Sequence, residues 1–550
     1  MKVWWIITLS LLLSLPVAAP TTTVFVPAPP TFTEMAQAVT DCAPLPAPPV
    51  GDTIVNVSTE AQLWTAVNEA QPHTTILLAD GTYNLGANGH YVWIATPYVT
   101  LRSASGNREA VILDDNYSAL EIVSIAASNV TVADITIKRA YTHPIHVMST
   151  DTADTLNTLI YNVHITDPGE QAIKVNPAGA GYYPDNGVIA CSTIELTDAG
   201  RPYIRDDCYT GGIDMHQARD WVVRDNVIEG FWCSSGLSEH GIHFWRGCRD
   251  PIVERNVLRN NARGVGFGMA TDGIARTYAD DPCPDASGYI DHYGGIIRNN
   301  FIFANRAELF ASADGYDNGI SLWNACEVET YHNSVISTQA PLAASIEWRF
   351  PNTSVDLVNN LVSHNLLARD DATATQAGNL AGAALALFVD GSGGDLHLLP
   401  SAAAAIDQGA ALSAGLCDDD IDGDARPIGS ARDIGADEYG IPTPDAVKDL
   451  RLLQAVLDGG TLTVTLHWTP PTGAVTTTVR YAAQPIAAAN WDAAPDFATG
   501  GVLDTATNTI PYDSGTRYFA LRTHNEGGWS ALSNLAFWPH NDVYLPLVMR

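Results

Sequence analysis

The sequence is poor in basic residues, with 28 Lys and Arg against 61 Asp and Glu and a formal net charge of −33. This charge argues against nucleic acid or an anionic membrane as a partner, because both repel an acidic surface. After the first residues, no apolar run is long enough to span a bilayer. The eight cysteines include no C-x2-C pair, so a cysteine-based metal site is not expected.

Residues 1–19 have the features of a secretory signal peptide. Lys2 precedes an apolar run, and Val17-Ala18-Ala19 has the small residues of a cleavage site. A transmembrane anchor is the alternative, but the run is short and Pro16 follows it. We therefore expect a secreted or cell-surface protein, with a flexible Pro/Thr-rich leader over residues 20–50.

Between residues 51 and 440 one short motif recurs at intervals of about 30 residues, and the segments between copies lack helical periodicity. Each copy has an apolar alternation that ends in Asn, then a second alternation. This period predicts the coils of a parallel β-helix. A buried Asn in each coil can bond the turn and its equivalents in adjacent coils. We place in this ladder Asp134, Asn162, Ser192, Asn226, Asn256, Asn300, Asn333 and Asn360.

The two ends of this region carry different patterns. Leu63, Trp64, Val67 and Ala70 recur at helical spacing, which predicts an amphipathic helix that covers the open end of the first coil. Beyond the prolines that follow residue 440, alternating strands with turn signals over residues 445–540 predict a small β-sandwich. Residues 541–550 form a C-terminal tail.

Residues 53 to about 400 resemble the secreted right-handed parallel β-helix proteins of the pectate-lyase-like superfamily, through the repeated Asn and Gly-Ile pattern. Residues 396–440 resemble a choice-of-anchor Q segment, which would close the β-helix region of residues 51–440. Residues 445–540 resemble a fibronectin type III domain, around Trp468 and Tyr518. The resemblance implies an all-β chain, a right-handed parallel β-helix solenoid followed by a small β-sandwich.

The second strand of each coil has a polar residue between two apolar ones, so the polar residue should point outward. Adjacent coils lie about 4.8 Å apart, which predicts a file of outward side chains. The first file contains His146, Lys174, Asp214, His243, Gly266, Ser321 and Glu347. A second file, two residues further on, contains Met148, Asn176, His216, Trp245, Gly268, Trp323 and Arg349.

These files predict a solvent-facing site on the middle coils. Residues 201–306 hold twelve Arg and fourteen acidic residues, so this part of an acidic protein could receive an anionic ligand. Aromatic faces beside polar groups suit sugar rings. The predicted catalytic residues are Lys174, Asp214, His216 and His243, and the predicted substrate-binding residues are His146, Asn176, Trp245, Arg246, Trp323 and Arg349.

The resemblance implies a polysaccharide lyase acting on an extracellular glycan that contains uronate. Such an enzyme removes the proton alpha to a carboxylate, with a basic side chain and a cation that neutralises the carboxylate. Lys174 or His243 would be the base, and His216 or Tyr209 the acid. The Asp-Asp and Arg-x-Lys signatures of polygalacturonases and the Arg-x-Pro-x-x-Arg segment of pectate lyases are missing.

Several alternatives stay open. Arg246 or Arg219 could hold the substrate carboxylate, and Asp214 with Glu239 or Asp206 would be the carboxylate pair of a glycoside hydrolase. A non-catalytic surface or adhesion protein that binds glycan is the other hypothesis. We expect a monomer.

Metal binding is the weakest part of the prediction, and we assign no metal ligands. His146, Asp214, His216 and His243 are the alternative as a transition-metal site. Calcium is an alternative cofactor, because the segment from Asp418 to Gly423 imitates the start of a calcium loop. Its twelfth position is Gly429 rather than Glu, which favours an acidic turn exposed to solvent.

Export favours disulfides. The spacing of the cysteines suggests three clips on loops between neighbouring coils, namely Cys191–Cys208, Cys233–Cys248 and Cys283–Cys326.

Overall fold

The computed structural model describes residues 42–87, 89–179, 181–205, 207–440, 444–525 and 527–538. The predicted signal peptide, most of the leader, the C-terminal tail and Asp206 lie outside these ranges. Within them, helices are too short or too polar to cross a membrane.

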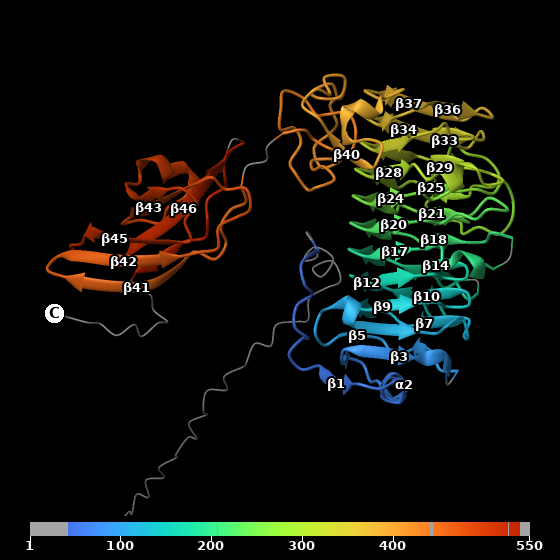
Figure 1. Ribbon diagram of the computed structural model, residues 1–550, viewed down its shortest axis with the longest axis horizontal. Coiled ribbons are helices and arrows are strands. Elements are labelled where there is room, and N and C mark those ends of the chain that lie inside the picture. Colours follow the sequence, from blue (N-terminus) through green and yellow to red (C-terminus); the bar gives the residue numbers. More distant parts are fainter. Residues whose placement is uncertain are drawn as a thin grey trace, which may run out of the picture. The chain divides into compact units, whose positions relative to one another are not determined.

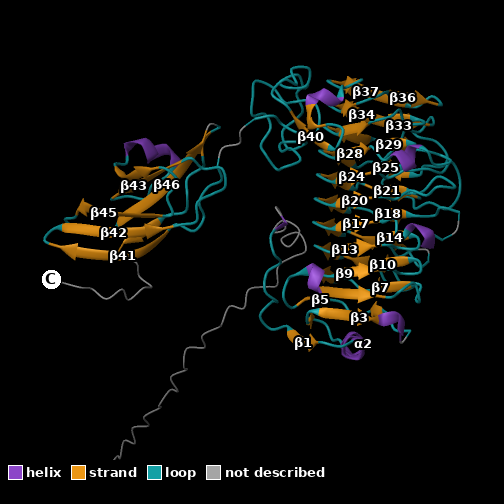
Figure 2. Ribbon diagram, in the orientation of Figure 1, coloured by secondary structure: helices purple, strands orange, loops and turns teal. Residues whose placement is uncertain are grey.

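Three long parallel sheets stack the chain into a right-handed parallel β-helix, which rises coil by coil from β1 to β37 (Figures 1 and 2). The first sheet pairs, in spatial order, β1 (Thr53–Val57), β2 (Thr74–Leu78), β5 (Val99–Ser103), β8 (Thr131–Ala133), β12 (Leu159–Tyr161), β16 (Val188–Ala190), β19 (Val222–Arg224), β23 (Ile252–Glu254), β27 (Ile296–Arg298), β31 (Val328–Tyr331), β34 (Ser354–Val358) and β37 (Thr373–Ala377).

The second sheet begins at the other end of the order and carries the predicted site. It pairs β36 (Leu366–Arg369), β33 (Ala344–Arg349), β29 (Asn318–Trp323), β25 (Arg263–Phe267), β21 (His240–Trp245), β18 (Gly211–His216), β14 (Gln171–Asn176), β10 (His143–Met148), β7 (Glu121–Ile125) and β4 (Val92–Ile94).

The third sheet completes each coil. It pairs β3 (Gly81–Asn84), β6 (Val111–Asp114), β9 (Thr136–Lys138), β13 (His164–Thr166), β17 (Thr193–Glu195), β20 (Val227–Glu229), β24 (Val257–Arg259), β28 (Phe301–Ala304), β32 (Ser334–Ser337), β35 (Leu361–Val362) and β38 (Leu380–Ala381). Short extra pairs are formed by β11 (Thr155–Leu156) with β15 (Pro184–Asp185), and by β22 (Cys248–Arg249), β26 (His292–Tyr293) and β30 (Ala325–Cys326).

Alternation within each strand builds the core. The inward stack of the second sheet is fully buried and consists of Ile145, Ile173, Ile213, Ile242, Val265, Ile320 and Ile346. The Gly before several of these residues has a packing reason. A Cβ on Gly264 would lie 2.9 Å from Cγ2 of Ile302, and one on Gly319 would lie 2.1 Å from Cγ1 of Val335. The Gly-Ile pattern therefore marks where the coil narrows onto the third sheet.

The asparagine ladder is confirmed from Asn226 to Asn360 and continues to Asn379. The Nδ2 group of each Asn donates to Oδ1 of the Asn in the next coil, at 3.0 Å for Asn226 and 2.9 Å for Asn300. The same oxygen accepts the backbone N–H of the preceding ladder residue. The side chains therefore form one continuous hydrogen-bonded chain along the solenoid.

The prediction is wrong for Asp134 and Asn162, which stand one residue before the ladder position. They have φ of +57° and +48°, and Asn162 bonds Asp134 at 2.8 Å. Asn and Asp tolerate this left-handed backbone, so the turn selects the same residue types as the ladder itself. Val163 fills the ladder position instead, and its N–H donates to Oγ of Ser192.

The predicted end helix is α2 (Glu60–Glu69), at the blue end of Figure 1. Thr59 caps it by accepting the N–H of Gln62 at 3.3 Å, and Leu63, Ala66 and Val67 are buried. Trp64 was expected on the buried face, but it is 45% exposed and stacks on His90. A second short helix, α3 (Ala307–Phe310), lies in a loop of the later coils.

Two of the three predicted disulfide pairings are wrong. The bonds are Cys42–Cys191, Cys208–Cys233 and Cys283–Cys326, and Cys248 and Cys417 are free and buried. Cys248 lies in a strand, where its thiol donates to Met215 O at 3.3 Å, so it cannot clip a loop. Cys42 also ties residues 42–50, expected to be a flexible leader, to the first sheet, where Tyr161 donates to Ala43 O.

Residues 385–440 close the solenoid on its third sheet. The hairpin of β39 (Phe388–Asp390) and β40 (Asp395–Leu398) packs its apolar side chains against Phe301, Phe303 and Ile336. Loops follow, held by a fully buried ion pair of 2.8 Å between Arg426 and Glu438.

Residues 444–538 form a small antiparallel β-sandwich around the buried Trp468. One sheet holds β41 (Arg451–Asp458), β42 (Thr461–His467) and β45 (Thr505–Pro511), and the other holds β44 (Asp496–Gly500), β43 (Thr476–Ala482), β46 (Arg517–Asn525), β47 (Gly528–Trp529) and β48 (Ala536–Trp538).

Replacing Asn256 by Ala should lower the free energy of unfolding by about 3 kcal/mol, because the loss of one amide leaves several buried backbone groups unpaired at about 1–3 kcal/mol each. Asn256 donates to Val223 O, Glu254 O and Asn300 Oδ1. Asn56→Ala, at an exposed position of β1, is the control and should change stability by less than about 0.5 kcal/mol. Urea unfolding compares them, and equal losses would contradict a special role for the ladder.

Candidate functional site

The outer face of the second sheet brings the predicted residues into one file. His146 pairs with Lys174, Lys174 with Asp214, and Asp214 with His243. The file then passes through Gly266 and Ser321 to Glu347. The second file is also in register where His216 pairs with Trp245 and Trp323 with Arg349. Parallel pairing without slips therefore confirms the predicted order.

The prediction that this file faces solvent is wrong for its central members. Lys174 is 7% exposed, Asp214 1% and His243 0%. Loops inserted between coils border them. The loops around Tyr209 and Glu239 are joined by the Cys208–Cys233 disulfide and by the hydrogen bond from Glu239 N to Thr210 O. Loop length in the sequence did not reveal this cover.

Another loop, residues 269–291, folds back beside the turn after β21. The buried carboxylate of Asp291 accepts the backbone N–H groups of Arg246, Met269 and Ala270 at 2.7–2.9 Å. The outer face is therefore a narrow, lined site rather than an open ladder.

Lys174, Asp214, His216 and Tyr209 meet at the accessible edge of the file. The Lys174 ammonium donates to Oδ2 of Asp214, lies 2.9 Å from Nε2 of His216 and 3.4 Å from the Tyr209 hydroxyl. His216 Nε2 also lies 3.2 Å from Asp214 Oδ2. His216 and Tyr209 are only partly buried, so both can contact a ligand.

Burial and charge set different protonation states in this group. Burial opposes the charge on Asp214, but Lys174 and His216 outweigh it and hold the pKa of this carboxyl well below its ordinary value. Burial also opposes the charge on Lys174, yet Asp214 raises the pKa of the ammonium. Burial lowers the pKa of His216 despite Asp214. At neutral pH, Lys174 is therefore a cation and His216 a neutral imidazole.

Trp245 and Arg246 flank this group. The Trp245 indole donates to Oδ1 of Asp214 at 2.8 Å and stacks on the His243 ring at a centroid distance of 5.1 Å. The Arg246 guanidinium lies over the indole, 4.3 Å from its centre. Among the described residues it has no carboxylate within ion-pair distance, whereas Arg219 is paired with Asp185 at 3.1 Å.

The other predicted binding residues fall into two separate groups. His146 lies between Glu121 Oε1 at 2.5 Å and Asn176 Oδ1 at 2.7 Å, beside Lys174. Trp323 donates to the buried Glu347 at 2.7 Å, and Arg349 pairs with Asp370. Gly266 and Gly268 separate this last group from the central one, so the structure does not bring all predicted residues together.

Two side chains that the sequence-based site omitted lie against His243. His240 stands three residues before it on β21, at a ring distance of 4.3 Å, and Glu239 precedes His240. The recurring His-x-x-His, at 143–146 and again at 240–243, is the signal that could have indicated them.

The calcium alternative does not fit the acidic loop. Both carboxylate oxygens of Asp420 are used by backbone groups, with Oδ1 accepting the N–H of Asp422 and Asp424, and Oδ2 that of Glu438. These bonds define an acidic turn that closes on itself.

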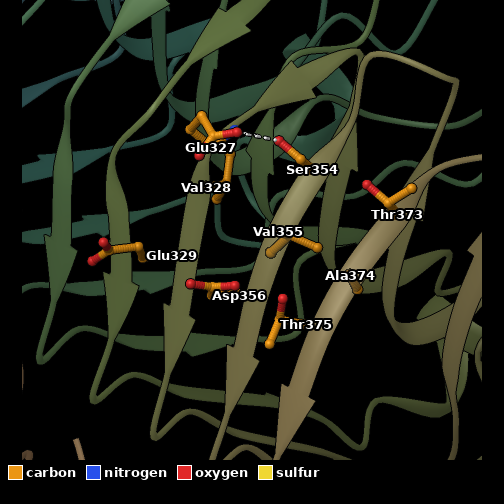
Figure 3. A pocket seen from close by; sticks show the side chains of 9 residues that line it. All are labelled: Glu327, Val328, Glu329, Ser354, Val355, Asp356, Thr373, Ala374 and Thr375. Carbon is orange, nitrogen blue, oxygen red and sulfur yellow. Dashed lines mark hydrogen bonds between the residues drawn. The ribbon is translucent and has the colours of Figure 1, made fainter. Parts of the chain in front are cut away.

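A separate hollow of about 290 Å³ lies on the outer face of the first sheet, across β31, β34 and β37 (Figure 3). Glu329 and Asp356 are register partners there, and Glu327 accepts from Ser354 at 3.0 Å. Burial and Asp356 raise the pKa of Glu329. None of the predicted site residues lines this hollow.

Comparison with known proteins gives neighbours in structure only. No protein-family model and no curated protein matches the sequence. An alginate lyase from Paenibacillus sp. str. FPU-7 is 13% identical, with 60% of this chain and 99% of the lyase aligned and a TM-score of 0.36. A polygalacturonase from Erwinia carotovora ssp. carotovora is 11% identical over 59% of this chain and 96% of its own, with a TM-score of 0.27.

The tailspike protein of Escherichia coli bacteriophage HK620, solved with a pentasaccharide, is 10% identical over 85% of this chain and 90% of its own, with a TM-score of 0.37. The right-handed parallel β-helix assigned to this chain rests on its own strand pairing.

Stability should fall as the pH is lowered from 7 to 4.5. Burial lowers the pKa of His143 to about 4 and that of His292 to about 3. The unfolded chain, with histidine pKa values near 6.5, binds more protons in this range, so each group's contribution is complete above about pH 6.5 and declines below it. His143 alone accounts for about 3 kcal/mol. Thermal unfolding at several pH values measures the slope.

His143→Gln should flatten this dependence, whereas Tyr203→Phe, on an exposed side chain, should not change it. A slope unaffected by His143→Gln would refute the assignment.

Proposed function

We propose that this protein is an exported carbohydrate-active enzyme, specifically a polysaccharide lyase that cleaves a uronate-containing glycan by β-elimination. The observation that carries the proposal is the meeting of a buried ion pair, Lys174–Asp214, with a neutral imidazole, His216, and a phenol, Tyr209, at one accessible edge. Groups with opposed protonation states side by side are what proton abstraction and donation require.

The protonation states assign the roles. Lys174, kept charged by Asp214, neutralises the substrate carboxylate as negative charge develops on it. His216 is the base, because its lowered pKa leaves the imidazole free of a proton. His243, fully buried, has no path to a substrate proton and acts through Asp214. Tyr209, whose hydroxyl keeps its proton because burial raises its pKa, is the acid.

The reaction balances with these groups alone. His216 removes the proton alpha to the carboxylate, the electron pair forms a carbon–carbon double bond, and the bond to the glycosidic oxygen breaks. Tyr209 gives its proton to that oxygen. Lys174, which lies 2.9 Å from His216 Nε2 and 3.4 Å from the Tyr209 hydroxyl, connects the two for the proton to return.

Substrate contacts come from the same coils. Arg246 is the better carboxylate partner, because Arg219 is paired with Asp185. The indole of Trp245 and the His146–Asn176 pair extend the site along the sheet. The sandwich as a fibronectin type III module, and residues 396–440 as a choice-of-anchor segment, would hold such an enzyme outside the cell. The three disulfides support export.

A glycan-binding protein without catalysis is the second candidate. The burial and mutual pairing of Lys174 and Asp214 favour it, because a satisfied ion pair can be purely structural. Binding would then use Arg246 and the partly exposed aromatic side chains alone.

Tyr209→Phe and His216→Gln should each lower kcat/KM by about 10²–10⁴-fold, the usual contribution of one proton-transfer group. The assay is the ultraviolet absorbance of unsaturated uronate ends, over a panel of uronate glycans. Tyr203→Phe is the matched control, since it removes an exposed hydroxyl from the same loop.

Wild-type turnover in Tyr209→Phe would refute the assignment of the acid. Binding to a glycan of the panel without any turnover would establish the second candidate.

A further inference from the structure

Three side chains next to the central file direct ligand atoms at one point. Nδ1 of His243 lies 3.2 Å from Oε2 of Glu239, and Nδ1 of His240 lies 3.7 Å from the same oxygen. All three atoms lie within 4.8 Å of one another. A single ion at bonding distance from each of them fits this spacing, because metal–nitrogen and metal–oxygen bonds are about 2.0–2.2 Å long.

These ligand atoms are buried and have no hydrogen-bond partner among the described residues. His240 is 2% exposed, His243 0%, and the Glu239 side chain 14%. Buried polar atoms are almost always paired, because leaving them unpaired is costly. Three such atoms converging on one point have the arrangement of a coordination site.

The far side of each imidazole is anchored, as in metal-binding histidines. Nε2 of His243 lies 3.4 Å from Gly268 O, which can only accept, so the ring hydrogen is on Nε2 and Nδ1 offers a lone pair. Nε2 of His240 lies 2.8 Å from Oγ of Ser321. Gly266 leaves room for this ring, since a Cβ there would lie 2.5 Å from His240 Nε2.

We propose that Glu239, His240 and His243 bind one divalent transition-metal ion, with zinc as the best fit. Two imidazole nitrogens and one carboxylate oxygen suit zinc and its first-row neighbours, whereas calcium and magnesium prefer oxygen alone. Asp214 Oδ1, 3.6 Å from His243 Nδ1, borders the site and adds a second negative charge. The proposal is independent of lyase activity, since the resting protein is what binds the ion.

The test uses the full secreted chain, stripped with a chelator and then offered zinc alone. Metal analysis should find one zinc per chain, and the thermal unfolding temperature should rise with zinc concentration. Glu239→Gln and His240→Gln should abolish both effects. Ser321→Ala, which only loosens the His240 ring, should weaken zinc binding by about 10–100-fold while the chain still folds.

His143→Gln is the matched control. His143 stands three residues before His146, as His240 stands before His243, and it is also buried, but its Nδ1 bonds Gln171 O at 3.0 Å. This variant should keep one zinc per chain.

Two outcomes overturn the proposal. Failure of the unmodified chain to take up stoichiometric zinc would mean that a protonated His243 bridges the carboxylates instead. One zinc retained by both Glu239→Gln and His240→Gln would place the ion elsewhere, for example at His397 and Asp422.

Discussion

Hydrogen bonding between successive coils is the constraint on which the rest of the structure depends. Backbone pairing sets the spacing, and the Asn226–Asn379 ladder prevents one coil from sliding on the next, because each amide bonds both its own turn and the following one. A slip of one residue would turn every core side chain outward. Residues 40 positions apart, such as Lys174 and Asp214, therefore become neighbours with a fixed orientation.

The inserted loops change what that register means chemically. An open ladder would leave Lys174, Asp214 and His243 in water, where their interaction would be screened. Covered by the loops around Tyr209 and Glu239, the same residues interact strongly, and the pKa of Asp214 falls while that of Lys174 rises. The coils determine which side chains meet, and the loops determine their protonation.

This division explains how much the sequence could predict. The coil period, the inward alternation and the outward file are local patterns of period two, and the structure confirms them from His146 to Glu347. Burial of the file and the Cys208–Cys233 pairing depend on how loops fold over it, which no local pattern encodes. The Asp134 error has a different origin, because turn and ladder select the same residue types.

The two His-x-x-His segments show why a motif alone could not define the site. On β10, both nitrogens of His146 are satisfied by Glu121 and Asn176, and His143 bonds a backbone carbonyl. On β21, the next coil presents Gly266, whose missing side chain lets the His240 ring reach Ser321 and leaves Nδ1 facing Glu239. The chemistry of each pair is decided by the adjacent coils, so a functional site in a solenoid has to be sought across the stack rather than along the strand.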